Sequence, residues 1–111
     1  MKYQKEIHAY LEAHQQEMLD VLEKFIAIRS VQGEPLENAP FGTEPKKALD
    51  LMLNFCQKFG FQTENAENYA GSADLNDLKP ELGILAHLDV VPEGDGWTHD
   101  PYQNDLRTGD R

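Results

Sequence analysis

The chain has 111 residues, of which 10 are Lys or Arg and 20 are Asp or Glu, so its formal net charge is −10 at pH 7. A chain of this length is one small domain or a piece of a larger one. The acidic balance argues against binding to nucleic-acid phosphates, which requires clustered basic side chains. No apolar run approaches the roughly 20 residues that cross a bilayer, and we expect neither a membrane span nor a signal peptide.

The first long segment, from Tyr3 to Ile28, contains no Gly or Pro, and its apolar residues recur mainly in steps of three and four. This spacing predicts an amphipathic helix with a bend near His14. His8 and His14 lie on this helix without a second histidine one turn away, so we interpret both as surface residues rather than metal ligands. The next residues, 30–42, carry two Pro and two Gly and are predicted to form a loop.

A second helix is expected to begin near Thr43-Glu44-Pro45, with Thr43 or Glu44 at its cap, and to end at Gly60. Beyond it, residues 61–63 and 69–75 are interpreted as short strands. The run Leu82 to Ala86 is almost entirely apolar, which is typical of an interior strand covered on both faces. This order of elements predicts an α/β fold in which two amphipathic helices pack on a small, partial sheet.

The single cysteine, Cys56, lies among apolar residues at helical spacing on the second predicted helix. It has no second cysteine in the chain with which to form a disulfide. These features predict a buried thiol in a reducing compartment, and hence a cytoplasmic protein.

The candidate site follows the third predicted strand. His87 stands at the end of that strand, and Asp89 comes two residues later, on the same side of an extended backbone. A carboxylate beside an imidazole can accept one ring N–H, which orients the ring and leaves the other nitrogen for a metal. The residues by themselves also fit a histidine that is satisfied within the core, so both interpretations stay open at this point.

The residues after Asp89 form a loop rich in Pro and Gly that ends at Trp97. Gly94 and Gly96 allow this loop to fold tightly against the strand end, although an ordinary surface turn fits the same spacing. Glu93 and Asp95 could approach a cation, but we expect both to be solvated carboxylates of the loop. His99 is a weak metal candidate, because Asp100-Pro101-Tyr102 beside it resemble packing and turn residues.

The segment GILAHLDVVPEGDGWTHDPY resembles the first metal-binding signature of the zinc-dependent exopeptidases, a family that includes aminoacylases, acetylornithine deacetylases, carboxypeptidase G and carnosinase-type dipeptidases. Phe41-Gly42 and Asn68-Tyr69-Ala70-Gly71 are similar to motifs of the bacterial Xaa-His dipeptidases of the peptidase V type. The likeness extends over essentially all 111 residues. It implies that residues 1–111 are the N-terminal portion of a metallopeptidase catalytic domain.

The resemblance implies that His87 is a ligand of one zinc ion and that Asp89 is the catalytic-site carboxylate that holds its ring. It also implies hydrolysis of dipeptides, including Xaa-His dipeptides, by a water shared between two zinc ions, with a glutamate as general base. Manganese or cobalt can occupy such sites as well. In relatives, that glutamate, the other metal ligands and a lid domain come after the position of Gly109-Asp110-Arg111, so we expect these 111 residues alone to be inactive.

Two alternatives stay open beside the dipeptidase interpretation. The chain could be a small acidic protein-interaction module derived from a truncated dipeptidase, with a free sheet edge and apolar helix faces for pairing. It could also be an incomplete reading frame whose product does not fold. A zinc titration that depends on His87 separates the first two, and a cooperative thermal transition excludes the third.

Overall fold

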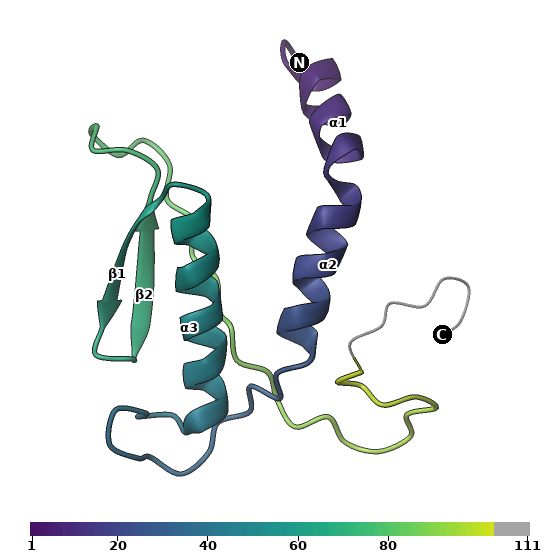
Figure 1. Ribbon diagram of the computed structural model, residues 1–111, viewed down its shortest axis with the longest axis vertical. Coiled ribbons are helices and arrows are strands. Elements are labelled where there is room, and N and C mark those ends of the chain that lie inside the picture. The colour runs from purple at the N-terminus through teal and green to yellow at the C-terminus, as the bar shows by residue number, and fades with distance from the viewer. Residues whose placement is uncertain (104–111) are drawn as a thin grey trace. The chain divides into compact units, whose positions relative to one another are not determined.

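The computed structural model describes residues 1–103 and divides the chain into two compact units. One unit comprises Met1–Ala27 and the C-terminal segment that begins at Gly96, and the other comprises Ile28–Asp95. The elements follow one another as α1, α2, α3, β1 and β2 (Figure 1). Within residues 1–103, no helix is both long enough and apolar enough to span a membrane.

The first unit contains α1, Gln4–Ala13, and α2, Gln15–Ile26. The predicted bend is confirmed as a break at His14, which has φ −109° and ψ 9°. The His14 ring stacks on the Tyr10 ring at a centroid distance of 3.9 Å, and its Nδ1 lies 2.8 Å from the Tyr10 carbonyl oxygen. The same Tyr10 carbonyl accepts the His14 backbone N–H at 3.1 Å, so the backbone and the ring of His14 both contact the last turn of α1.

The second unit is built around α3, Thr43–Lys58. Its N-cap is Gly42, so the expectation that Thr43 or Glu44 caps the helix is wrong. Gly42 has a φ of 96°, and a Cβ at this position would lie 3.1 Å from the Gly33 backbone, so only glycine fits without strain. At the other end, Gly60 has a φ of 84° just after the helix, which confirms the predicted stop.

The sheet is a two-stranded antiparallel hairpin of β1, Gln62–Ala66, and β2, Ala70–Asp74. It confirms the strands predicted at residues 61–63 and 69–75, with β1 longer than expected. The register pairs Gln62 with Asp74 at the open end of the hairpin.

The helix α3 packs along this hairpin (Figure 1). A Cβ on Gly71 of β2 would lie 2.8 Å from the Leu53 Cδ2 and 3.0 Å from the Leu49 Cδ1, so the missing side chain makes room for the helix. The buried hydrophobic residues of the described chain are Ala39, Ala48 and Leu49. The core therefore sits where α3 meets the hairpin and the loop that precedes the helix.

The coarse α/β arrangement agrees with the expectation, but several of its details differ. Of the two helices expected to pack on the sheet, α3 does so, whereas α1 and α2 belong to the other unit. Cys56 is half-buried rather than buried.

The run Leu82 to Ala86 is not the interior strand that its apolar residues indicate. The side chains along it are exposed, with Leu85 fully so, and β1 and β2 form the only sheet in residues 1–103. An interior strand needs a hydrogen-bonding partner at its edge and apolar cover on its faces. The described part of the chain supplies neither, so the segment is extended without belonging to a sheet.

Candidate functional site

His87 and Asp89 lie side by side on this extended segment, in the second unit. The His87 Nδ1 is 3.3 Å from the Asp89 Oδ1 and 2.9 Å from the Asp89 backbone carbonyl oxygen. The side chains are 83% and 63% exposed, respectively. The structure thus brings together the two predicted site residues, and it does so at the surface rather than at the end of a buried strand.

The position of the ring proton follows from these contacts. A backbone carbonyl oxygen can only accept a hydrogen bond, so Nδ1 is the donor in its contact with Asp89. In a neutral ring, Nε2 then keeps its lone pair. This tautomer presents Nε2 as a ligand atom, while the Asp89 carboxylate lies on the opposite side of the ring.

The backbone around Asp89 is held by Ser30, which is 3% exposed. The Ser30 hydroxyl donates to the Leu88 carbonyl oxygen at 2.8 Å, and the Ser30 carbonyl accepts from the Val90 N–H at 3.1 Å. Ser30 is separated from Leu88 by 58 positions in the sequence. No local pattern could have identified this contact, and sequence reasoning missed it.

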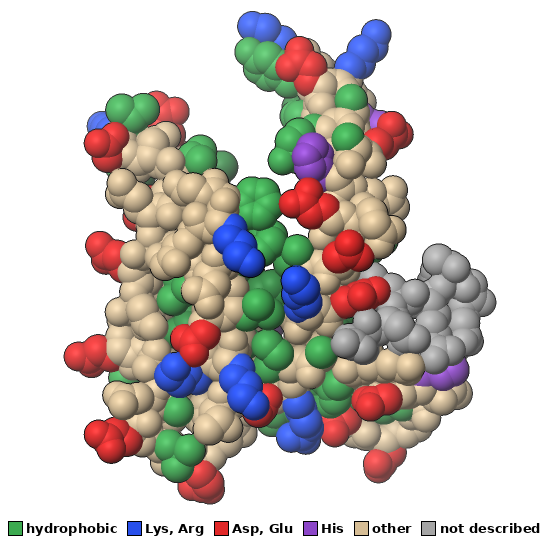
Figure 2. Space-filling model, viewed as in Figure 1, with side chains coloured by type: hydrophobic (Ala, Val, Ile, Leu, Met, Phe, Trp, Pro, Cys, Tyr) green, Lys and Arg blue, Asp and Glu red, His purple; other side chains and the backbone are tan. Residues whose placement is uncertain are grey.

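Glu93 is paired, so the expectation of a solvated carboxylate is wrong for this residue. The Arg29 Nε lies 3.2 and 3.1 Å from the two carboxylate oxygens of Glu93, and the Arg29 Nη2 lies 3.0 Å from Oε2. Asp95 is exposed, as expected. Elsewhere on the visible surface, acidic side chains are dispersed and mixed with basic ones (Figure 2).

The other histidines are placed differently. His8 lies on α1 with its Nε2 3.7 Å from the Glu12 carboxylate, both side chains being exposed. His99 belongs to the unit that contains α1 and α2. Within residues 1–103, no three His, Cys, Asp or Glu side chains gather into a group that could hold a metal ion.

The residues present fit one part of a zinc site. Zinc takes imidazole nitrogen and carboxylate oxygen as ligands, and metal-binding histidines usually donate their second N–H to a carboxylate or a backbone carbonyl. The Nδ1 of His87 has both kinds of acceptor beside it, the carboxylate and the backbone carbonyl of Asp89. Gly109-Asp110-Arg111, the point from which the resemblance places further ligands, lies outside the described residues.

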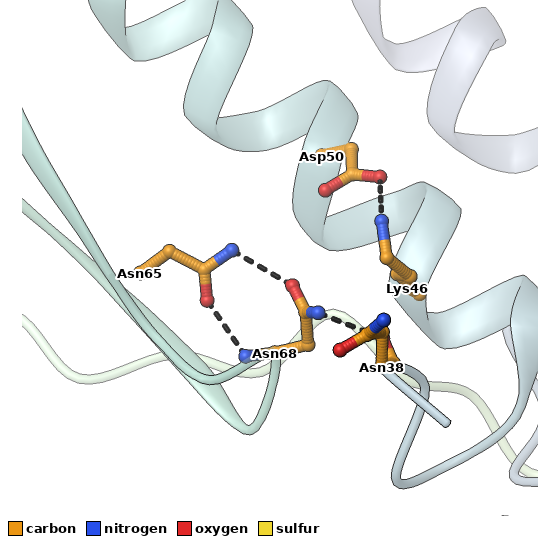
Figure 3. Close-up of polar contacts among 5 residues, drawn as sticks. All are labelled: Asn38, Lys46, Asp50, Asn65 and Asn68. Atoms are coloured by element: carbon orange, nitrogen blue, oxygen red, sulfur yellow. Dashed lines mark hydrogen bonds and ion pairs between the residues drawn. The ribbon is translucent and has the colours of Figure 1, made fainter. Parts of the chain in front are cut away.

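A separate cluster of amides fixes the turn of the hairpin (Figure 3). The Asn68 side chain donates to the Asn38 carbonyl oxygen at 2.7 Å and accepts from the Asn65 amide at 2.8 Å. An open cavity of about 570 Å³ lies beside it, lined by Pro35, Leu36, Asn38, Pro40, Glu67, Asn68 and Tyr69. The cavity does not include His87, so it is not part of the candidate site.

Comparison with known proteins relates the chain to dipeptidases. No protein-family model matches it. A Beta-Ala-Xaa dipeptidase of Lactobacillus delbrueckii subsp. lactis is 43% identical over 99 residues, which cover 86% of this chain and 21% of that protein. A "putative dipeptidase" of Staphylococcus aureus strain USA300 is 36% identical over 95 residues, which cover 84% of this chain and 20% of that protein. The chain thus spans about a fifth of the length of these curated relatives.

Proposed function

We propose that this chain, with its sequence similarity to dipeptidases, contributes His87 and Asp89 to the metal site of a zinc-dependent dipeptidase. The observation that carries the proposal is the contact of the His87 Nδ1 with both the carboxylate and the carbonyl of Asp89. In this arrangement Nε2 is the ligand atom. A bound zinc ion would lower the pKa of a coordinated water and polarise the scissile carbonyl.

The roles of the two side chains follow from their chemistry. His87 supplies a neutral nitrogen, and Asp89 keeps the proton on Nδ1 and fixes the direction of the ring. A carboxylate in this position also raises the basicity of the ligating nitrogen. Neither residue removes a proton from water in this scheme, because the general base is a glutamate that the described residues do not place near His87.

The substrate class is proposed from two sources. The resemblance to Xaa-His dipeptidases and the Beta-Ala-Xaa dipeptidase relative both indicate dipeptides. The dipeptide β-Ala-His satisfies both descriptions, and it is therefore the first substrate to test. Manganese and cobalt should be compared with zinc, since imidazole and carboxylate ligands accept all three.

A metal titration of the 111-residue chain tests the site. We expect zinc to bind saturably to the chain, with the ring signals of His87 perturbed in nuclear magnetic resonance spectra, and this zinc binding to be lost in His87→Ala. The matched control is His8→Ala, which removes another exposed histidine next to a carboxylate. Zinc binding that is unchanged in His87→Ala, or lost equally in His8→Ala, would contradict the proposal.

The purified chain alone should not hydrolyse β-Ala-His. The physical reason is that His87 and Asp89 leave most of the coordination sphere of a zinc ion to water, whereas catalytic zinc sites usually have three protein ligands. The measurement is release of histidine with and without added zinc. Hydrolysis that is abolished by a chelator and by His87→Ala would show that these 111 residues hold a complete active site.

The second candidate function is a protein-interaction module, and one observation favours it. α1 and α2 bury no residue, and their exposed apolar side chains include Ile7, Tyr10, Leu11, Met18 and Leu22. A stable chain that ignores zinc and binds a defined protein through this surface would support the module over the metal site.

A further inference from the structure

We propose that Ser30 and Arg29 are positioning residues that hold the segment 87–93 in the form that the metal site needs, an inference that rests on the proposed role of His87. This segment has no regular secondary structure. The side chains of His87 and Asp89 are mostly exposed, so burial does not fix them. Their arrangement must therefore come from specific bonds to the backbone that carries them.

Ser30 anchors the peptide groups on both sides of Asp89. Its hydroxyl binds the carbonyl of the Leu88–Asp89 peptide, and its own carbonyl binds the N–H of the Asp89–Val90 peptide. Holding both groups restricts the two backbone dihedrals of Asp89 and with them the direction of its carboxylate. Because Ser30 is itself buried, the surrounding residues restrict the motion of its side chain and backbone.

The second of these peptides also contacts the His87 ring. The Val90 N–H and the Asp89 carbonyl belong to one planar peptide group, with the N–H and the C=O pointing in opposite directions. Ser30 holds the N–H side at 3.1 Å, and the His87 Nδ1 lies 2.9 Å from the carbonyl side. The buried Ser30 is thus connected through one rigid plane to the nitrogen whose proton decides the tautomer of His87.

Arg29 secures the far end of the same segment. Its guanidinium contacts both carboxylate oxygens of Glu93, and such two-point charged pairs fix geometry as well as distance. Arg29 and Ser30 are adjacent, so one short stretch of chain holds the segment at residues 88–90 and again at residue 93. The loop between these points is thereby kept beside the candidate site.

The test compares Ser30→Ala with Ser30→Thr, which retains the hydroxyl, and with Ser72→Ala on the exposed face of β2 as the matched control. Two quantities are measured on the full chain: the nitrogen shifts of the His87 ring without metal, which report the tautomer, and the zinc affinity at His87. Loss of an outer partner of a metal ligand typically costs 10–100-fold in affinity. We expect Ser30→Ala to weaken zinc binding by about 10-fold and to reduce the Nδ1–H tautomer.

The ring signals of Tyr69, in the same unit, distinguish a general loss of structure from a loss of positioning at His87. Positioning requires Ser30→Thr to restore the tautomer, while the Tyr69 ring signals of the same unit stay as in the wild type in all three variants. If Ser30→Ala keeps both the wild-type tautomer and the wild-type zinc affinity, the inference is overturned. If Ser30→Ala does not fold, the tautomer and the zinc affinity are measured in Glu93→Gln, which breaks the contact of Arg29 with the far end of the segment. Wild-type values of both quantities in that variant overturn the inference.

Failure of the inference and failure of the proposed function give different results. If the wild-type chain binds no zinc at His87, the proposed function fails, and the tautomer in the metal-free variants alone decides the role of Ser30. If zinc binds at His87 with equal affinity in the wild type and Ser30→Ala and the tautomer is unchanged, the proposed function stands and the positioning role is refuted.

Discussion

Gly42 links the loop that carries Ser30 to the start of α3, and its replacement by Ala should destabilise the second unit. The residue has φ 96° and ψ 172°, a combination that is essentially restricted to glycine. A Cβ there would also lie 3.1 Å from both the Cα and the N of Gly33 and 3.3 Å from its carbonyl carbon. Gly33 cannot move away without cost, because its N–H donates to the Phe41 carbonyl at 2.8 Å.

The magnitude follows from three terms. A side chain in this backbone region costs about 1–3 kcal/mol, and crowding against a fixed backbone adds about 1 kcal/mol, at the lower end of overpacking effects. The reduced entropy of the unfolded chain returns about 0.4–1 kcal/mol. We therefore expect Gly42→Ala to lower the free energy of unfolding by about 2 kcal/mol, which is a fall in Tm of roughly 10 °C for a unit of this size.

Two further glycines serve as graded controls. Gly60 has a φ of 84° but nothing within 4 Å of a Cβ, so Gly60→Ala meets strain without crowding and should cost less, about 1 kcal/mol. Gly83 has neither feature, and Gly83→Ala should be neutral within about 0.5 kcal/mol. Thermal unfolding followed by far-ultraviolet circular dichroism measures all three. Equal effects of Gly42→Ala and Gly83→Ala would refute the reasoning.

Two other predictions concern contacts in the same unit. Asn68→Ala removes the two hydrogen bonds of the Asn68 side chain, to the Asn65 amide and the Asn38 carbonyl, and places Ala at a φ of 64°. It should therefore destabilise by about 1–2 kcal/mol, whereas Asn68→Gly tolerates the φ and should cost about half as much, as measured by urea unfolding. Equal losses would show that backbone strain contributes nothing. Glu93→Gln breaks the charged contact with Arg29, and because Arg29 is half exposed the cost should be only about 0.5 kcal/mol at low salt, shrinking in about 1 M NaCl. A loss that does not depend on salt would mean that packing rather than charge holds this pair.

The elements that sequence predicted well are those with local causes. The apolar period of three and four residues, the stop at Gly60 and the break near His14 all depend on residues within a turn or two of one another, and the structure has each of them. The pairing of His87 with Asp89 is of the same kind, because two positions in an extended chain suffice to bring the side chains together.

Two of the predictions that failed did so for non-local causes. Leu82 to Ala86 has the composition of an interior strand, but a strand exists only where another backbone pairs with it, and the described chain provides no partner. Glu93 was likewise misjudged, because its partner Arg29 is 64 positions away. The composition of a segment indicates which structures it can adopt, but its contacts with distant residues determine which structure forms.

The sequence by itself determined the approximate extents of the helical segments, that two strands follow α3, and that an imidazole and a carboxylate stand two residues apart. Only the tertiary structure decided that Ser30 and Arg29 contact the segment that carries this imidazole and this carboxylate. The physical reason is that hydrogen bonds and ion pairs across 58 to 64 positions arise from how the chain folds back on itself, which no local spacing of residue types encodes.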